Sequence, residues 1–258
     1  MSRKIVITSG KGGVGKTTVT ANLAYRLAAA GERVVAVDGD LGLNNLDVAM
    51  GAEGSIAYDL FDCMDGRCRV KQALVQSPWH KNLFLLPAKF GKNRSGDARS
   101  MSGVITELGR TFDYVLLDCP AGIDEGFRRA VTCAEEALVV ITPHVSAIRD
   151  ADKVVGLLTE GRSMGVGLVV NKMRGDLAAS GDVLGANEIA SLLKVRVAGV
   201  IPEDDRITVG LSLALGGGGR AFKMLADNVR SGRCRLYDCE SRYTGFLGSI
   251  RRKLKRIL

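Results

Sequence analysis

The chain is poor in aromatic residues and histidine, and it has no long apolar run. Phe, Trp and Tyr make up 5% of its 258 residues, without the interleaving of basic and aromatic residues that is typical of single-stranded nucleic-acid binders. No apolar stretch approaches the roughly 18 residues that a membrane-spanning helix needs. A secretory signal peptide would need a longer apolar segment than MSRKIVITSG offers, and a small-residue cleavage site. We therefore predict a cytoplasmic protein.

The six cysteines indicate reduced thiols rather than a disulfide framework, because the chain is long and has no secretory signal. Two pairs, Cys63–Cys68 and Cys234–Cys239, share the spacing C-x4-C. Zinc sites usually have C-x2-C spacing or histidines close by, and this chain has two histidines in all. Inert thiols are the favoured interpretation, and a metal site is the alternative.

Positive charge is concentrated near the C-terminus. The formal net charge is +8, and from Arg230 to the end there are nine basic residues against two acidic ones. The rest of the chain is nearly neutral. A negatively charged partner is therefore expected at the tail rather than across the whole surface.

Short apolar runs alternate with amphipathic segments along most of the chain. Strands are expected at 4–9, 33–38, 82–88, 113–120, 136–143, 166–172 and 195–202. Several of these runs lack polar alternation, as expected of parallel strands covered on both faces. Helices are expected at 16–31, 99–110, 146–162 and 186–194. This pattern predicts an α/β fold with a doubly wound, mostly parallel sheet in a single domain.

The alternation of strands and helices stops after residue 231. We therefore predict a domain at 1–231, a linker at 232–245 and an amphipathic helix at 246–258. Just before this boundary, the four glycines at 216–219 are expected to be flexible or tightly turned.

The first apolar run leads into SGKGGVGKTT, which contains the phosphate-loop pattern G-x-x-x-x-G-K-[ST] at Gly10, Gly15, Lys16 and Thr17. Glycines let backbone N–H groups converge on phosphates, and the following helix presents its positive end. Lys16 is expected to reach the β- and γ-phosphates and the Thr17 hydroxyl to bind Mg²⁺. The alternative is a glycine turn without a ligand, but the strand before and the helix after favour a P-loop NTPase.

Acidic residues follow two other predicted strands. Asp118 ends YVLLD, where a P-loop protein holds Mg²⁺ through water, and Asp38 and Asp40 follow the strand at 33–38. The C-terminal ends of parallel strands meet in one crevice, so these carboxylates are expected to face the phosphate loop. We predict that Asp38 lies nearer the metal and that Asp40 orients the attacking water. Strand or helix capping is the alternative role for each.

The base is expected to bind at the far strands. The Asn171 amide can both donate to and accept from adenine, and the backbone of IPEDD, which includes Pro202, Glu203 and Asp204, can complete the pocket. Guanine recognition usually needs a carboxylate two residues after such an N-K pair, and Met173 stands there. The sequence therefore favours adenine.

These residues together resemble one family. KGGVGKTT, covering Lys11, Gly12, Gly13, Val14 and Thr18 besides the residues above, is the deviant Walker A motif of the MinD/ParA class of ATPases, whose extra lysine is here Lys11. Within that class, VDGDLGLNNLD, DCPAG, SAIRDAD and GVIPED look like the septum-site-determining members. The resemblance runs from residue 3 to about 206 and resumes at the extreme C-terminus.

The resemblance implies ATP and Mg²⁺ as cofactors and an ATP-dependent homodimer in which Lys11 contacts the phosphates of the other subunit. It also implies a MinC-like inhibitor and a MinE-like activator as partners, and no specific nucleic acid. The surface with Asp150 and Asp152 is a candidate for dimer or partner contacts. Departures from the family pattern are Asn44, where arginine is common, and the segments 211–220 and 225–245.

The tail FLGSIRRKLKRIL is amphipathic when drawn as a helix. Its basic residues lie outside one arc that holds all the apolar residues: Phe246, Leu247, Ile250, Leu254, Ile257 and Leu258. This pattern predicts an interfacial helix that binds an anionic membrane reversibly, and the Gly248–Ser249 pair predicts disorder until it does so. The alternatives are a terminal helix packed on the domain and a nucleic-acid-binding segment.

Together these features predict a membrane-associating, ATP-dependent dimerising ATPase of division-site placement that recruits a division inhibitor and is stimulated by a partner. A ParA-like ATPase that positions DNA or other cargo is the alternative, and a phosphotransferase is a third interpretation.

Overall fold

The computed structural model describes residues 2–40, 45–54, 56–88, 98–161, 164–208 and 216–257, and of residues 98–100, 208 and 253–257 it describes the backbone alone. Asn44, Leu258 and residues 211–215 lie outside the described residues. The same holds for the side chains of Leu254 and Ile257.

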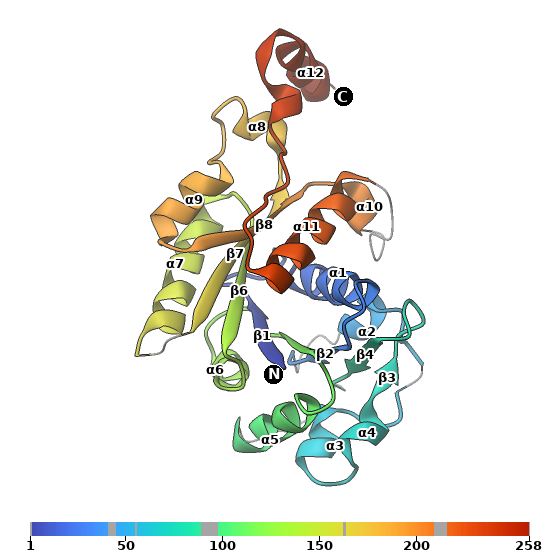
Figure 1. Cartoon of the computed structure of the whole chain (residues 1–258). Coiled ribbons are helices and arrows are strands. Elements are labelled where there is room, and N and C mark those ends of the chain that lie inside the picture. Colours follow the sequence, from blue (N-terminus) through green and yellow to red (C-terminus); the bar gives the residue numbers. More distant parts are fainter. Residues whose placement is uncertain are drawn as a thin grey trace.

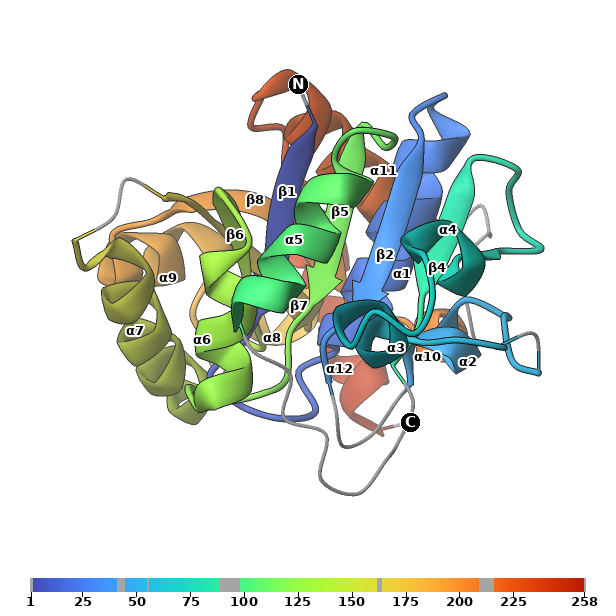
Figure 2. The ribbon, with the colours of Figure 1, turned by 90° about the horizontal axis from the view of Figure 1, so that it is seen from below.

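The centre of the molecule is an eight-stranded sheet of order β3-β4-β2-β5-β1-β6-β7-β8 (Figures 1 and 2). Its strands are β1 (Arg3–Thr8), β2 (Val34–Asp38), β3 (Val75–Gln76), β4 (Leu83–Leu86), β5 (Tyr114–Asp118), β6 (Glu136–Ile141), β7 (Gly165–Met173) and β8 (Arg196–Pro202). All neighbours pair in parallel except β3 with β4. The predicted doubly wound, mostly parallel sheet is confirmed; the two-residue strand β3 was not expected, because it is too short to leave a pattern.

Helices cover both faces of this sheet (Figure 2). They are α1 (Lys16–Ala29), α2 (Leu46–Ala49), α3 (Leu60–Met64), α4 (Val70–Ala73), α5 (Ala98–Leu108), α6 (Glu125–Thr132), α7 (Val145–Thr159), α8 (Gly175–Ala178), α9 (Ala186–Leu193), α10 (Asp205–Thr208), α11 (Gly217–Ser231), the 3₁₀ turn η1 (Ser241–Tyr243) and α12 (Gly245–Ile257). One core contains Leu27 of α1 and Phe222 of α11, and the other contains Ile105 of α5 and Ile189 of α9. Because every strand except β3 contributes to both cores, each of these strands needs apolar residues on both faces.

The glycine run at 216–219 opens α11 instead of forming a flexible loop. A Cβ on Gly217 would lie 2.8 Å from the Tyr237 hydroxyl, and one on Gly218 would lie 2.5 Å from Ile207. The missing side chains therefore allow the start of α11 to pack closely on α10 and on the chain that follows α11.

The predicted linker is not a free tether, because residues 232–240, here called the strap, pack along the domain (Figure 1). The Asn228 amide donates to the Arg235 carbonyl (2.8 Å), and the Arg235 N–H donates back to Asn228 Oδ1 (3.0 Å). Tyr237 packs against the core and Cys239 is buried in it. The Cys239 backbone lies so close to Gly175 that a Cβ there would collide with it. The strap thus ends beside α8.

The tail helix α12 is formed and docked, which corrects the expectation of disorder. Gly248 is buried, and a Cβ on it would collide with the Tyr243 backbone. Arg252 donates to the carbonyls of Tyr243 (2.7 Å) and Ala179 (3.2 Å). The glycine that lowers helix propensity is therefore the residue that permits the contact. Among the described residues, no helix is long and apolar enough to cross a membrane.

Candidate nucleotide-binding site

The site forms at the point in the sheet where the chain stops adding strands on one side of β1 and begins to add them on the other. β1 lies in the sheet between β5 and β6, and the chain leaves β1 toward β2 on one side and later reaches β6 on the other. In open α/β sheets, ligands bind at this point, outside the carboxyl ends of the strands. The loop of residues 9–15 follows β1 there and leads into α1.

The conformation of this loop depends on its glycines. Gly13 (φ 76°) and Gly15 (φ 90°) adopt the left-handed region, which other residues rarely enter. Gly15 caps α1 without a side-chain hydrogen bond, and the first turn of the helix has no acidic residue. The N–H groups of that turn are thus left for an anion rather than a capping side chain.

Gly10 has a different role, because it packs against α7. A Cβ at Gly10 would lie 2.5 Å from the carbonyl oxygen of Asp150. Only glycine fits between the end of β1 and this helix. The contact ties the start of the phosphate loop directly to α7.

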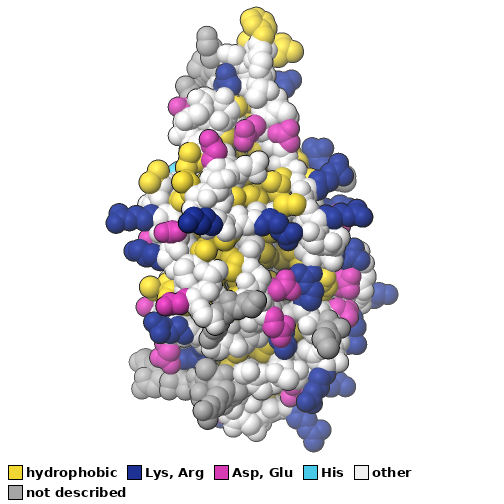
Figure 3. All heavy atoms as spheres, turned by 60° about the vertical axis from the view of Figure 1, so that its left-hand side comes forward, with side chains coloured by type: hydrophobic (Ala, Val, Ile, Leu, Met, Phe, Trp, Pro, Cys, Tyr) yellow, Lys and Arg dark blue, Asp and Glu magenta, His cyan; other side chains and the backbone are white. Residues whose placement is uncertain are grey.

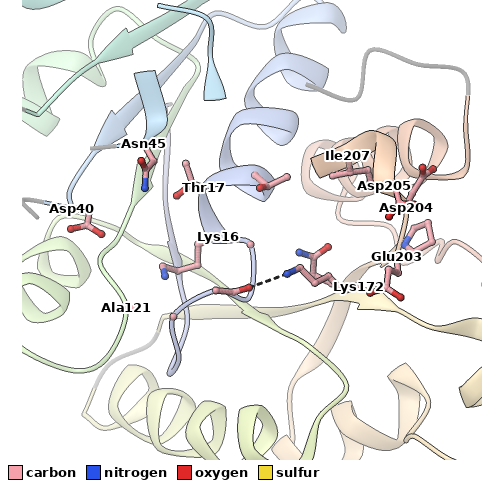
Figure 4. Close-up of a pocket in the computed structure, with 16 residues that line it drawn as sticks. Lys16, Thr17, Asp40, Asn45, Ala121, Lys172, Glu203, Asp204, Asp205 and Ile207 are labelled. Atoms are coloured by element: carbon pink, nitrogen blue, oxygen red, sulfur yellow. Dashed lines mark hydrogen bonds between the residues drawn. The ribbon is translucent and has the colours of Figure 1, made fainter. Parts of the chain in front are cut away.

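A cavity of about 500 Å³ opens over the phosphate loop (Figure 4). Asp40 and Asn45 lie at one end, Glu203 to Ile207 lie at the other, and Lys16 lies between them. Of the sequence-predicted site residues, the following line it: Gly12, Gly13, Gly15, Lys16, Thr17, Thr18, Asp40, Asn171, Pro202, Glu203 and Asp204. Gly10, Lys11, Val14, Asp38 and Asp118 are not among its lining residues. The elongated polar cavity is suited to a nucleotide, with phosphates at the loop and the base toward β8.

Two carboxylates lie side by side beneath the cavity. Asp38 and Asp118 end β2 and β5 and are direct partners in the parallel register. Both are buried. Asp118 accepts hydrogen bonds from Thr17 (2.6 Å) and Thr20 (3.0 Å), two hydroxyls on successive turns of α1. Asp38 accepts from the Asp40 N–H (2.9 Å), which holds the start of the following loop.

Burial makes the charged form of both carboxylates unfavourable. Burial, followed by the nearby Asp118 carboxylate, raises the pKa of Asp38 to about 8. Burial likewise raises the pKa of Asp118 to about 6, although the hydrogen bonds from Thr17 and Thr20 and the charge of Lys16 lower it. A cation bound beside both groups would relieve this penalty.

The residues present fit Mg²⁺ bound together with a nucleotide. In the described residues no cluster of three or more His, Cys, Asp or Glu side chains could hold a metal ion. The Thr17 hydroxyl and the Asp38 and Asp118 carboxylates offer oxygen ligands, and Mg²⁺ in such sites takes its remaining ligands from phosphates and water.

Asn171 is placed differently from the expectation. Its side chain is buried, and its amide nitrogen donates to the Val14 carbonyl (2.8 Å). The amide thus ties the end of β7 to the phosphate loop with one of its two N–H groups, which leaves the second N–H as a donor and Oδ1 as an acceptor. The contact with Val14 was not expected from the sequence, and the adenine contact of Asn171 stays a prediction.

The neighbouring Lys172 lines the cavity and was not assigned a role from the sequence. Its ζ-amino group donates to the Gly13 carbonyl (3.1 Å; Figure 4), and its backbone is left-handed (φ 54°). A non-glycine residue in that region is uncommon and often marks a functional position. The N-K pair near the end of β7 was the signal that could have identified it.

Thr20, Asn45 and Ile207 were also missed, whereas Asp205 is the last residue of the predicted IPEDD segment. Thr20 donates a hydrogen bond to Asp118, and Asn45, Asp205 and Ile207 line the cavity. A threonine in the second turn of a helix is not part of any recognised nucleotide-binding motif. Asn45, Asp205 and Ile207 reach the cavity only because of the way α2 and α10 pack in the folded chain. No local signal identifies Thr20, Asn45 or Ile207.

Lys11 lies outside the cavity. It is exposed, and its ζ-amino group is 3.4 Å from the Ser146 hydroxyl at the start of α7. Of the two candidate partner residues, Asp152 is exposed and Asp150 is half-buried against Gly10. Lys11, Asp152 and the start of α7 therefore belong to the surface beside the cavity rather than to its lining.

Comparisons with known proteins agree with this geometry. The family described as CobQ/CobB/MinD/ParA nucleotide binding domain matches residues 5–210. The septum site-determining protein MinD of Synechocystis is 41% identical, over 98% of this chain and 99% of the relative. The MinC:MinD cell division complex of Aquifex aeolicus superposes with a TM-score of 0.83 at 37% identity, covering 90% of this chain and 96% of that one. The MinD of Pyrococcus horikoshii complexed with Mg-ADP gives 0.81 at 32% identity, with 90% and 97% covered.

Proposed function

The chain belongs to the CobQ/CobB/MinD/ParA nucleotide-binding family and, within it, to the septum site-determining MinD proteins. On this basis we propose that it is a dimerising ATPase that positions the division site on a membrane. ATP and Mg²⁺ are its cofactors. The observation that carries the proposal is the combination of two features. The phosphate loop has a lysine directed away from its own cavity, and α12 presents apolar side chains to the outside.

The chemistry follows from the residues around the cavity. The open N–H groups of α1 and the Lys16 ammonium bind phosphate, and Thr17 with Asp38 and Asp118 would hold Mg²⁺, which neutralises phosphate charge when it is bound. Asp40 lies at the phosphate end of the cavity, where its carboxylate can orient a water molecule toward the γ-phosphate. The backbone N–H of Asp40 donates a hydrogen bond to the Asp38 carboxylate, which links the position of Asp40 to the carboxylates proposed to hold Mg²⁺.

Lys11 supplies the switch in this proposal. Its charge is held at Ser146 on α7, so it adds little to phosphate binding within one chain. When two ATP-bound chains associate, the Lys11 of each chain can contact the phosphates of the ATP bound by the other chain. A cation delivered in trans stabilises charge on phosphate only in the dimer. ATP then favours the dimer, and hydrolysis releases it.

The tail supplies the membrane contact. Phe246, Leu247 and Ile250 are exposed to 82%, 69% and 44%, and hydrophobic side chains mark the tip of the molecule where α12 lies (Figure 3). Each basic residue near an anionic leaflet contributes about 1 kcal/mol. One tail therefore binds weakly, whereas two tails on a dimer bind together through a raised effective concentration.

The partner surface is the exposed part of α7. Because a relative is seen in a MinC:MinD complex, we assign a MinC-like inhibitor to this chain, with a MinE-like activator as the second partner. Asp152 on α7 is available to both. On the face of the molecule that Figure 3 shows, basic and acidic side chains are interspersed, and no single basic patch suits DNA there.

The test is co-sedimentation of the Asp40→Ala protein, which is expected to bind ATP without hydrolysing it. We expect this protein to co-sediment with anionic liposomes in the presence of ATP but not of ADP. Size-exclusion chromatography should show a dimer with ATP. Duplex DNA in place of liposomes should leave it in the supernatant. ATP-dependent binding to DNA without binding to liposomes would replace this proposal with the ParA-like alternative.

A further inference from the structure

The two C-x4-C pairs have the same spacing but different surroundings. The sulfurs of Cys63 and Cys68 lie 3.5 Å apart at the end of α3. In the other pair, the Cys234 thiol donates to the Val197 carbonyl (3.0 Å), near the start of β8, whereas Cys239 lies against Gly175, beyond the end of β7. These two strands are parallel, so Cys234 and Cys239 lie toward opposite ends of the sheet.

Backbone hydrogen bonds hold the first pair in this arrangement. Gly66 turns the chain with φ 72°, and its N–H donates to the Cys63 carbonyl (3.1 Å). The N–H of Arg67 donates to the Asp62 carbonyl (2.8 Å), and the Arg67 guanidinium pairs with Asp62 (3.5 Å) and Asp65 (3.3 Å). Cys68 is thus fixed opposite Cys63 before any bond forms between them. Since a disulfide joins sulfurs at about 2.05 Å, only a short further approach is needed.

The two thiols are half-buried, so small molecules can reach them. Burial, and then the hydrogen bond with Cys68, raises the pKa of the Cys63 thiol well above its ordinary value. Either sulfur can be the donor in the contact between the two thiols.

We propose that Cys63 and Cys68 form a redox-active dithiol, which a small-molecule disulfide oxidises to an intramolecular disulfide. The thiolate of one cysteine attacks one sulfur of the oxidant and releases one small thiol. The sulfur of the other cysteine then attacks the protein sulfur of the mixed disulfide and releases the second small thiol. The two protons of the protein thiols end on the released thiols, and the oxidant gains the two electrons that the protein loses.

The site lies beside the nucleotide-binding edge of the sheet. The N–H of Leu60, at the start of α3, donates to the Pro87 carbonyl after β4 (2.8 Å). Leu60, Phe61 and Met64 line a small cavity together with Gly39, the residue before Asp40. A disulfide that closes the loop after α3 restrains the unfolded chain and is expected to stabilise this region.

The test uses the full chain in mixtures of oxidised and reduced glutathione, followed by alkylation and peptide mass spectrometry. We expect a Cys63–Cys68 cross-link at ratios that leave Cys234 and Cys239 alkylated. Oxidation should raise the melting temperature of the wild type and of the matched control Cys234→Ser, but not that of Cys63→Ser or Cys68→Ser.

Three results would overturn the proposal. The first is alkylation of both Cys63 and Cys68 at ratios where glutathione is mostly oxidised. The second is oxidation of Cys234 and Cys239 at the same ratio as Cys63 and Cys68. The third is a glutathione adduct on Cys63 or Cys68 that the other cysteine of the pair does not displace. Because the cysteines lie outside the nucleotide-binding machinery, the Cys63→Ser protein should bind ADP as the wild type does, which shows that it is folded.

Discussion

Lys11 and Lys16 belong to the same phosphate loop but lie in different surroundings. Lys16 lines the cavity, and Lys11 lies at Ser146. We expect Lys16→Ala to weaken binding of fluorescent ADP at least about 100-fold, because charge-assisted bonds to buried phosphate contribute about 3 kcal/mol. Lys11→Ala should bind ADP within about 3-fold of the wild type but lose the ATP-dependent dimer in size-exclusion chromatography. Normal dimerisation of the Lys11→Ala protein with ATP would show that this lysine does not act in trans.

Asp38 makes the stability of the nucleotide-free protein depend on pH. Its pKa is raised from 3.8 to about 8, so the folded state binds more protons than the unfolded state between these values. Stability therefore falls as pH rises through that window. In EDTA, Asp38→Asn should raise the free energy of unfolding at pH 8 by about 1–3 kcal/mol and leave it nearly unchanged at pH 4. Urea unfolding across this range measures the effect.

A part of the pH dependence should survive in that variant, because burial raises the pKa of Asp118 to about 6. The residual slope is therefore expected between pH 4 and 6. An Asp38→Asn protein with the wild-type slope between pH 6 and 8 would contradict the assignment. Added Mg²⁺ and ADP should restore stability to the wild type at pH 8 and much less to the variant.

At the level of elements, the docking of α12 depends on Gly248. A Cβ there meets the Tyr243 backbone, whereas one on Gly156, within α7, meets nothing within 4 Å. Replacing a helical glycine by alanine normally stabilises a helix by about 0.5–1 kcal/mol. We therefore expect Gly156→Ala to raise the melting temperature slightly and Gly248→Ala to release α12.

Hydrogen exchange measures this release. Gly248→Ala should speed exchange at residues 241–252 and leave the central strands protected, and Gly156→Ala should change neither. Protection of α12 in the Gly248→Ala protein that equals the wild type would show that the helix does not depend on this contact. The interaction of Arg252 with Ala179 and Tyr243 predicts the same local loss for Arg252→Ala.

For the whole molecule, membrane recruitment combines dimerisation with the exposed face of α12. Leu247 on α12 and Leu192 on α9 are exposed to 69% and 60%, so a glutamate at either position makes a matched change. Leu247→Glu removes an apolar contact and adds a negative charge beside an anionic leaflet. It should lower ATP-dependent co-sedimentation with anionic liposomes at least about 10-fold, since the loss applies to both tails of a dimer. Leu192→Glu should co-sediment as the wild type does, and an equal loss in both variants would argue against a specific role of α12.

Much of the fold and part of the site could be predicted because they depend on neighbours in the chain. The predicted strand at 113–120 contains β5, and that at 136–143 contains β6, since buried parallel strands need continuous apolar runs. The adjacency of Asp38 and Asp118 also follows from a local feature, because each ends a strand and parallel strands end at one edge. Residues 125–132, which form α6, were not among the predicted helices, because eight residues make only about two helical turns.

The phosphate loop, the alternation of strands and helices and the amphipathic tail are properties of contiguous residues, and the sequence alone was enough to predict them. Contacts between distant segments were decided by register and packing: the Asn171 amide on Val14, the strap against Asn228, and Gly248 on Tyr243. The two cysteine pairs illustrate the difference, since one spacing brings Cys63 and Cys68 together and leaves Cys234 beside Val197. Spacing fixes how far apart two side chains can lie, and only the path of the backbone between them, set by the burial of its neighbours, brings them into contact.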